Sequence, residues 1–310
     1  MTLLRGRSAR SLLSGQFSTR VIVLMPVAIA LNIVLGATVQ QALKLPIYLD
    51  SIGTILVGVL AGPLAGLATG VLSNLIWGYV LPAPVGNPVL GPFAITAGAI
   101  GLLAGLWGWA GLFRSRPEAA GRATVGAVIA LGLVALLAFY TYTRAYASPE
   151  AYEGITFFDP ATFDQSRLFF IGIMVIFIAL IGYGLFLRRD LGAVYAVAAG
   201  LVTGIVAAVV SAPISAFVFG GVTGGGTDAL VAAFRLAGAS LEQATLQQGL
   251  LADPLDKMVT SFVVFFLVGS LSRRMVARFP NGRRLLPRDQ PGADAPGGTD
   301  VRPSTDLSAR

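Results

Sequence analysis

Long apolar runs alternate along the chain with short segments rich in Arg, Pro, Gly or acidic residues. A membrane-spanning helix needs about 20 apolar residues, whereas a strand of a membrane barrel needs about 10 in strict alternation, so these unbroken runs fit helices. The pattern predicts an all-α, polytopic integral membrane helical bundle of about eight transmembrane helices. We expect these helices near residues 21–43, 47–62, 63–81, 93–113, 122–143, 168–187, 191–219 and 257–273.

The segments outside the helices predict the rest of the organisation. Residues 1–20 form a basic, cytoplasmic N-terminus, and residues 21–279 form the transmembrane domain. The segments 144–167 and 220–256 are acidic or neutral and are expected to be outer loops. Residues 280–310 have neither apolar mass nor periodicity, which predicts a disordered cytoplasmic tail. The run at 191–219 is long enough to bend or break at Pro213.

Arginine clusters orient the predicted helices. With eight crossings all of the clusters fall on one side of the membrane, and the positive-inside rule makes that side cytoplasmic. Both termini are therefore expected inside the cell, in a multi-pass protein of the cytoplasmic (inner) membrane. The clusters are Arg5, Arg7, Arg10 and Arg20; Arg114, Arg116 and Arg122; Arg188 and Arg189; and Arg273, Arg274, Arg278, Arg283 and Arg284.

Composition agrees with a membrane location and narrows the chemistry. The chain is 55% hydrophobic and only 12% charged, with a mean hydropathy of +0.78. It therefore has too little polar surface to coat soluble domains of 310 residues. The net charge of +7 comes from arginines at the ends of apolar runs and indicates topology, with no nucleic-acid partner. The lipid bilayer is the expected surrounding.

The absence of His and Cys excludes imidazole acid–base chemistry, thiol nucleophiles and structural zinc. With no paired inward carboxylates either, we expect no catalytic residues, no metal site, no cofactor and no enzymatic activity. The string Gly220–Thr227 resembles a phosphate-binding loop, but Gly226 stands where the lysine is needed. Energy for any transport must therefore come from an ion gradient or a partner.

Polar residues at the outer ends of the helices are the candidate binding groups. Asp50 begins the second helix and is either an N-cap or a binding-site carboxylate. Tyr48 beside it is either an interfacial belt residue or an aromatic wall. Asn74 and Trp77 share a face of the third helix and suit a flat heterocycle, or else serve as helix–helix contact and belt residue. Asn87 lies in the stiff, uncharged loop that follows and that could cap a cavity.

Two later helices supply further candidates near the same level. Ser211 and Ser215 lie four residues apart on one helix face, where they either bind a ligand or hydrogen-bond to backbone carbonyls of their own helix. Lys257 begins the last predicted helix and either snorkels beside an Asp256 N-cap or points inward as a cation for the ligand. Together these residues predict an outward-facing capture pocket. The inner halves of the helices hold almost no polar groups, Asn32 excepted, which argues against a self-sufficient transport cycle.

Small residues on the first helix predict a close helix contact. Ala28, Asn32 and Gly36 are spaced by four and form a narrow strip. The strip packs either against another helix of this chain or against a partner protein.

The residues around the second helix resemble a known family. The run Asp50-Ser51-Ile52-Gly53-Thr54-Ile55, followed by Leu60-Ala61-Gly62-Pro63-Leu64-Ala65-Gly66 and by Asn74, is similar to the substrate-binding S components of energy-coupling factor (ECF) vitamin transporters. The resemblance covers residues 45–80 and, more loosely, the last two helices. Those proteins typically have six helices, so residues 122–187 look like an insertion or a lineage-specific elaboration.

The resemblance implies a membrane-embedded substrate-capture subunit for a vitamin, vitamin precursor or related small heterocycle. Its pocket would face outward and be closed by the loop between the first two helices. Its partners would be an ECF scaffold transmembrane subunit and two ABC ATPase subunits, with Ala28, Asn32 and Gly36 as a loose counterpart of the family's docking strip. The alternatives are a self-sufficient secondary transporter, a membrane sensor or scaffold module, and an integral membrane enzyme.

Overall fold

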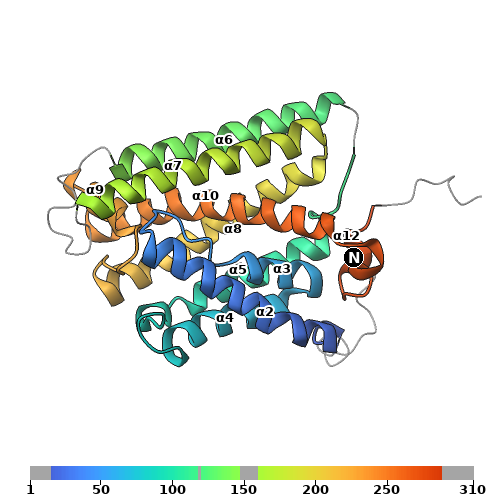
Figure 1. Cartoon of the computed structure of the whole chain (residues 1–310), viewed down its shortest axis with the longest axis horizontal. Helices are drawn as coiled ribbons and strands as arrows, with labels where there is room; N and C mark the ends of the chain where they lie inside the picture. Colours follow the sequence, from blue (N-terminus) through green and yellow to red (C-terminus); the bar gives the residue numbers. More distant parts are fainter. Residues whose placement is uncertain (1–14, 118–119, 147–159, 288–310) are drawn as a thin grey trace, which may run out of the picture.

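The computed structural model describes residues 15–117, 120–146 and 160–287, and the long helices of this part lie along one axis of an elongated bundle (Figure 1). No strand is found there beyond one isolated bridge between Pro117 and Asp190, so the all-α prediction is confirmed for these residues. The α-helices are α2 (Thr19–Gly36), α3 (Ile52–Ala61), α4 (Pro63–Leu75), α5 (Ala94–Ala110), α6 (Ala120–Tyr146), α7 (Pro160–Gly182), α8 (Leu191–Pro213), α9 (Asp228–Leu236), α10 (Leu241–Ser270), α11 (Arg273–Val276) and α12 (Gly282–Leu285).

Several helices continue into a turn of wider, π-helical geometry. α8 ends at Pro213, where the expected bend or break is instead a change to π-helical geometry, and the chain runs on through η6 before turning. The π-helical segments are η1 (Ala37–Ala42), η2 (Ile76–Val80), η5 (Tyr183–Leu187) and η6 (Ile214–Val218), and η3 (Pro88–Leu90) is a short 3₁₀ helix.

Within the described residues, five helical segments of 18 to 28 residues are apolar enough to cross a membrane. Two further apolar helices, Ile52–Ala61 and Ala94–Ala110, are shorter. Five such segments are the pattern of a multi-pass membrane protein. The five are Thr19–Ala42, Pro63–Val80, Arg122–Tyr146, Pro160–Leu187 and Leu191–Val218.

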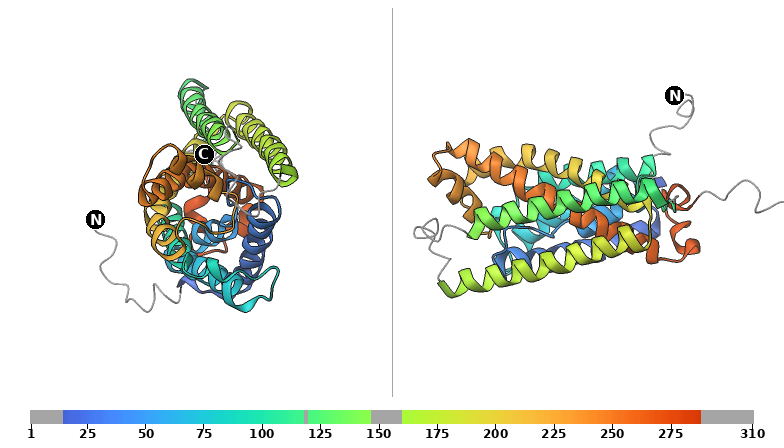
Figure 2. Two further views of the ribbon diagram at one scale, coloured as in Figure 1. Left: turned by 90° about the vertical axis from the view of Figure 1, so that its left-hand side faces the viewer. Right: turned by 90° about the horizontal axis from the view of Figure 1, so that it is seen from above.

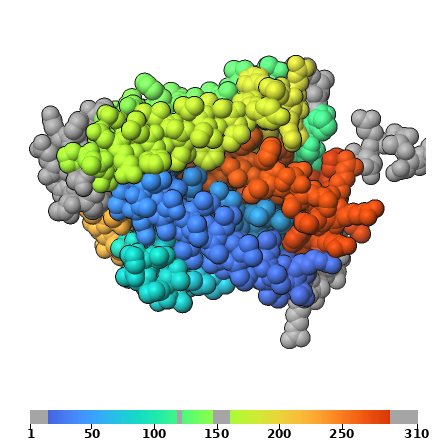
Figure 3. All heavy atoms as spheres, viewed as in Figure 1, coloured from blue at the N-terminus to red at the C-terminus, as the bar shows by residue number. Residues whose placement is uncertain are grey.

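Helices α6 and α7 stand apart from the others. Seen along the bundle, they form a pair outside the group made by the remaining long helices (Figure 2, left). α6 presents small side chains, among them Ala127 and Ala130, to the core formed with α8 and α10. α7 lies exposed along one side of the molecule (Figure 3), with apolar side chains such as Leu168 and Val175 on its surface. Apolar side chains in that position suit contact with lipid tails.

Glycines permit the closest helix contacts of the core. A Cβ atom on Gly101 of α5 would lie 2.1 Å from the carbonyl oxygen of Gly66 of α4. A Cβ atom on Gly200 of α8 would lie 2.2 Å from the carbonyl oxygen of Lys257 on α10. Small residues therefore bring the α4–α5 and α8–α10 backbones together, as they do in many membrane bundles.

The arginine-rich segments gather at one end of the bundle. The Arg114 guanidinium donates to the carbonyl of Arg284 at 2.8 Å, and that of Arg20 donates to the carbonyl of Arg278 at 3.5 Å. α9 and the loops after α2, α4 and α8 lie at the opposite end (Figure 1). The two ends therefore differ in charge as the sequence pattern predicts.

The last helix is longer than predicted. α10 begins at Leu241, because Ser240 and Gln243 form a capping box there, so the predicted start at 257 is wrong. The predicted outer loop 220–256 accordingly contains α9 and the first half of α10.

Other boundaries also differ from the sequence prediction. The helix expected over 47–62 begins only at Ile52. The expected disordered tail of 280–310 begins instead with ordered residues, since the Asn281 side chain donates to the carbonyl of Val59 at 3.1 Å and α12 follows. Residues 288–310, 1–14 of the N-terminus and 147–159 of the 144–167 loop lie outside the described residues.

Candidate ligand-binding site

A pocket opens between η1, the start of α5, the end of α8 and the first half of α10, toward the end of the bundle away from the arginines. It holds about 940 Å³ of space free of protein atoms, part of it open to solvent. Carboxamides, hydroxyls and charged groups dominate its walls. The carboxamide side chains are those of Gln40, Gln41, Asn74, Asn87 and Gln248.

The segment 43–51 between α2 and α3 supplies one wall of the pocket, with Tyr48, Asp50 and Ser51. Its backbone is held by a carboxylate on α10, because the N–H groups of Tyr48 and Leu49 donate to Asp256 Oδ1 at 3.3 and 2.7 Å. The backbone of Leu49 has a φ of 54°. This is a left-handed conformation that side chains rarely adopt. The bond to Asp256 helps to keep this strained residue in place.

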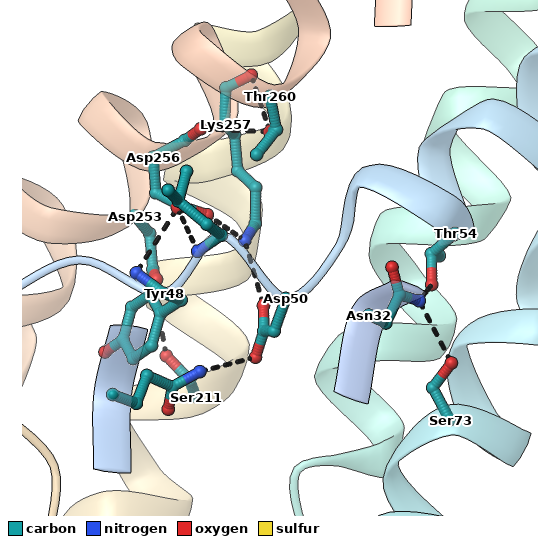
Figure 4. A network of polar contacts seen from close by, with 12 residues as sticks. Asn32, Tyr48, Asp50, Thr54, Ser73, Ser211, Asp253, Asp256, Lys257 and Thr260 are labelled. Carbon is teal, nitrogen blue, oxygen red and sulfur yellow. Dashed lines mark hydrogen bonds and ion pairs between the residues drawn. The ribbon is translucent and has the colours of Figure 1, made fainter. Parts of the chain in front are cut away.

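A cluster of charged groups lies beneath this segment (Figure 4). Lys257 and Asp256, both fully buried, form an ion pair on α10. The Lys257 Nζ atom also lies 3.8 Å from Asp50 Oδ1 and 5.7 Å from the centre of the Tyr48 ring. Asp50 accepts a further hydrogen bond from Gln40 Nε2 at 3.0 Å. The cluster thus ties α2, the 43–51 segment and α10 together at the pocket wall.

Asp253 lies one helical turn before Lys257 and also lines the pocket. Its side chain is 4% exposed, and within the described residues its hydrogen-bond partner is the Ser211 hydroxyl at 3.3 Å. That hydroxyl is also 3.3 Å from the carbonyl of Ala208. Its single proton can serve only one acceptor at a time. Asp253 is therefore the most weakly satisfied carboxylate of the site.

The loop between η6 and α9 closes another side of the pocket. Asp228 accepts hydrogen bonds from the backbone N–H groups of Thr223 and Gly224 and from the Thr223 hydroxyl, at 2.7 to 2.8 Å. Lys44 Nζ donates to the carbonyl of Gly224 at 2.7 Å, which joins this loop to the 43–51 segment. Burial raises the pKa of Asp228 to about 6, although these hydrogen bonds and the nearby Lys44 ammonium oppose the shift.

The pocket brings together most of the residues that the sequence singled out. The sequence interpretations of Asp50 and Lys257 as cap and snorkelling residue are wrong, because Ser51 is the N-cap of α3 and Lys257 points into the protein. Whether these side chains bind a ligand stays a prediction. The residues on the pocket wall are Tyr48, Asp50, Asn74, Asn87, Ser211, Ser215 and Lys257.

Several of these residues also have structural hydrogen bonds. The Tyr48 hydroxyl accepts from Gln248 Nε2 at 2.9 Å. Asn74 Nδ2 donates to the carbonyl of Leu90 at 3.1 Å, and Asn87 Oδ1 accepts from the Val89 N–H at 3.1 Å. They therefore hold the pocket wall in shape, whatever they contact inside it.

Trp77 does not line the pocket, contrary to its predicted stacking role. The indole is 1% exposed and packs against Ile29 and Ile33 of α2. Its Nε1 atom donates to the carbonyl of Val85 at 2.8 Å. Trp77 thus fixes the loop after α4 and is a core residue.

The predicted docking strip on α2 is used inside the chain. Ala28 is 2% and Asn32 1% exposed, and a Cβ atom on Gly36 would lie 2.4 Å from the Trp77 ring. Asn32 donates to the hydroxyls of Thr54 and Ser73 at 2.8 and 3.0 Å, and its Oδ1 accepts from the Gly53 N–H at 2.7 Å. The interpretation of Ala28, Asn32 and Gly36 as a surface for a partner is therefore wrong, and internal packing is the correct alternative.

Sequence reasoning missed several pocket residues. Gln248 and Asp253 fell in a predicted loop, although the pattern Ser240-Leu241-Glu242-Gln243 is a capping-box signature that marks the true start of α10. Gln40 lies in the π-helical end of the first helix, for which the sequence offers no signal.

The site is built for binding by hydrogen bonds and charge. Within residues 15–117, 120–146 and 160–287, no three His, Cys, Asp or Glu side chains are grouped so that they could hold a metal ion. No family model, no curated protein and no solved structure matches the chain, so the geometry of the pocket carries the functional argument.

Proposed function

We propose that the protein is a membrane-embedded substrate-capture subunit, an S component of an ECF-type ABC importer. Its ligand would be a vitamin, a vitamin precursor or a related small heterocycle. The observation that carries the proposal is the pocket with many polar lining residues at the end away from the arginines, walled by the segment between α2 and α3. The resemblance of residues 45–80 to the family implies a pocket closed by this same connection.

The arrangement of the helices supports this proposal. Without the outer pair α6 and α7, the long helices that remain are α2, α4, α5, α8 and α10, joined by the shorter α3. That set corresponds to the six helices of the family. We propose that eight helices, including α3, α5 and α10, cross the cell membrane, with both termini in the cytoplasm.

The pocket walls suit a small heterocycle. Carboxamides both donate and accept hydrogen bonds, which matches ring nitrogens and exocyclic amino or carbonyl groups. Phe93 lines the pocket and stacks on Phe219 at 5.7 Å between ring centres. An aromatic surface on which a flat ring can stack is thus held ready beside the polar groups.

The proposed partners are an ECF scaffold transmembrane subunit and two ABC ATPase subunits. Since Ala28, Asn32 and Gly36 pack inside the chain, the scaffold would have to contact another face. α2 exposes Val23, Val27 and Val34 on its outer side.

Two measurements test this proposal. Purified in mild detergent from its native membrane, the protein should carry a small heterocyclic molecule, identified by mass spectrometry, together with an ATP-binding cassette pair. Reconstituted alone in liposomes, it should bind that molecule, labelled with tritium, without concentrating it. Absence of any bound small molecule and of any ATPase would overturn the proposal.

A self-sufficient secondary transporter is the second candidate, because one observation favours it. Asp253, Asp256 and Lys257 are buried in the middle of the 30-residue α10, whereas the sequence predicted almost no ionisable groups at depth. Buried carboxylates of this kind couple ion movement in many transporters. Accumulation of the labelled molecule by liposomes that contain this chain alone, driven by a proton or sodium gradient, would establish this alternative.

A further inference from the structure

The charged cluster at the pocket wall is not balanced by the protein alone. Three buried or half-buried carboxylates, those of Asp50, Asp253 and Asp256, surround the single ammonium of Lys257. With all four groups ionised, the formal charge of the cluster is −2. An uncompensated charge inside a membrane protein is costly, so it is offset either by a proton on one of the carboxyls or by a positive partner, and only a positive partner would make the pocket selective for cations.

Asp253 is the carboxylate with room for such a partner. Asp256 is occupied by Lys257 and two backbone N–H groups, and Asp50 by Lys257 and Gln40. Among the described residues, Asp253 has one hydrogen-bond partner, the shared Ser211 hydroxyl at 3.3 Å, besides the electrostatic attraction of Lys257, although it is 4% exposed and lines the cavity. An ionised carboxylate normally accepts several hydrogen bonds, so acceptor positions on Asp253 stay open toward the pocket.

A bare metal ion fits this site poorly, because no group of three metal-ligating side chains exists in the described part of the chain. Phe93, Leu90 and Ile100 add apolar surface to the same cavity. A small organic cation would use both kinds of surface, its charge near the carboxylates and its flat body near Phe93.

We propose that the pocket selects a small, flat organic cation, a protonated amine, an amidine-like group or a charged ring nitrogen, with its positive charge at Asp253 and Asp50 nearby. This inference rests on the proposed capture function and narrows its substrate class. Lys257 then serves to hold Asp256 and Asp50 in place, and does not contact an anionic ligand.

Three probes of nearly the same shape test the charge preference. Benzamidinium, benzamide and benzoate carry charges of +1, 0 and −1 on one planar ring, and their binding to the ligand-free protein in detergent is measured by calorimetry. We expect benzamidinium to bind most tightly and benzoate most weakly. Because a hydrogen bond to a charged group is worth roughly 1.5–3 kcal/mol, Asp253→Asn should weaken benzamidinium binding by about 10- to 150-fold. The affinity for benzamide should change by less than about threefold.

Matched controls separate this effect from a folding defect. Asp164→Asn makes the same chemical change on the surface of α7, where the side chain is 62% exposed, and should leave all three affinities unchanged. Without ligand, Asp253→Asn should unfold at the wild-type temperature or above it, because it removes a poorly satisfied buried charge. Asp50→Asn is a second variant that should also weaken benzamidinium binding.

The inference is overturned if benzamide or benzoate binds as tightly as benzamidinium, if none of the three probes binds, or if Asp253→Asn leaves the preference intact. The proposed capture function fails separately. A neutral or anionic molecule that co-purifies with the protein would support that function and contradict only the cationic substrate class.

Discussion

Individual side chains at the pocket end of the bundle hold the backbone around the pocket in place. Asp256 accepts from two N–H groups of the 43–51 segment, and Trp77 donates to the carbonyl of Val85 in the loop after α4. Neither residue lines the pocket. Both therefore act on a ligand through the segments they hold, and their substitution should change stability before it changes recognition.

Trp77→Ala should lower the stability of the protein strongly. The substitution leaves a cavity between α2 and η2 and an unpaired Val85 carbonyl. Such truncations cost about 3–5 kcal/mol. Thermal unfolding in detergent measures the effect. Trp77→Phe keeps most of the ring volume but not the N–H donor, so its unfolding temperature should lie between those of Trp77→Ala and the wild type. A Trp77→Ala variant that unfolds like the wild type but no longer binds its ligand would contradict this core role and support the predicted stacking of the indole on the ligand.

At the scale of the helices, uninterrupted apolar runs predicted the helix boundaries well, whereas polar residues inside a helix led to wrong boundaries. α4 taken with η2, α5 and α6 begin and end within a few residues of their expected positions, because each is a long and mostly apolar run. The prediction placed the first half of α10 in a loop because Asp253, Asp256 and Lys257 are charged. Charged residues favour a loop in the sequence pattern unless their partners from the 43–51 segment and α8 are known. Such long-range pairing leaves no local signal in one sequence.

For the candidate site, too, some residues were placed correctly from the sequence and others were not. Residues at predicted helix ends, such as Asn74 and Ser215, do lie at the pocket wall because the ends of neighbouring helices meet there. Trp77 has the same sequence signature but its helix turns it toward α2. The face that a residue presents within the last, π-helical turn depends on the changed pitch, which periodicity cannot reveal.

The loop between η6 and α9 should be sensitive to pH through Asp228. Its pKa is raised from 3.8 to about 6 when the loop is closed, so the closed loop takes up a proton more readily than an open one. The closed state is then most stable at low pH and loses stability as the pH rises through about 4 to 6. Lowering the pH from 7 to 5, one unit below this pKa, should increase the protection of residues 220–227 by about tenfold.

Hydrogen exchange of this peptide, corrected for the intrinsic pH dependence of the amides, measures the effect. Lys44 is the charged group near Asp228; burial lowers the pKa of its ammonium and the Asp228 carboxylate opposes that shift. Asp228→Asn should remove the pH dependence while Asp164→Asn on α7 leaves it unchanged. Equal protection of the wild-type loop at pH 5 and pH 7 would contradict the assignment.

At the scale of the whole molecule, charge and cavity lie at opposite ends of one bundle. The Arg114–Arg284 and Arg20–Arg278 contacts lie at one end. The pocket lies at the other end, with the 43–51 segment and the loop between η6 and α9 that form two of its sides. The proposed capture of an external solute for cytoplasmic ATPases would require this polarity. The outer pair α6 and α7 adds lipid-facing surface without contributing to the pocket wall.

The orientation of the bundle can be tested directly, because the native chain has no cysteine. Ala237 lies exposed between α9 and α10 at the pocket end, and Ser272 lies exposed after α10 at the arginine end. If the arginines face the cytoplasm, Ala237→Cys should react with a membrane-impermeant maleimide in intact cells, and Ser272→Cys should react only after permeabilisation. Both variants should label equally in detergent, which controls for local accessibility. Labelling of Ser272→Cys in intact cells would reverse the orientation and place the pocket on the cytoplasmic side, where it could not capture an external solute.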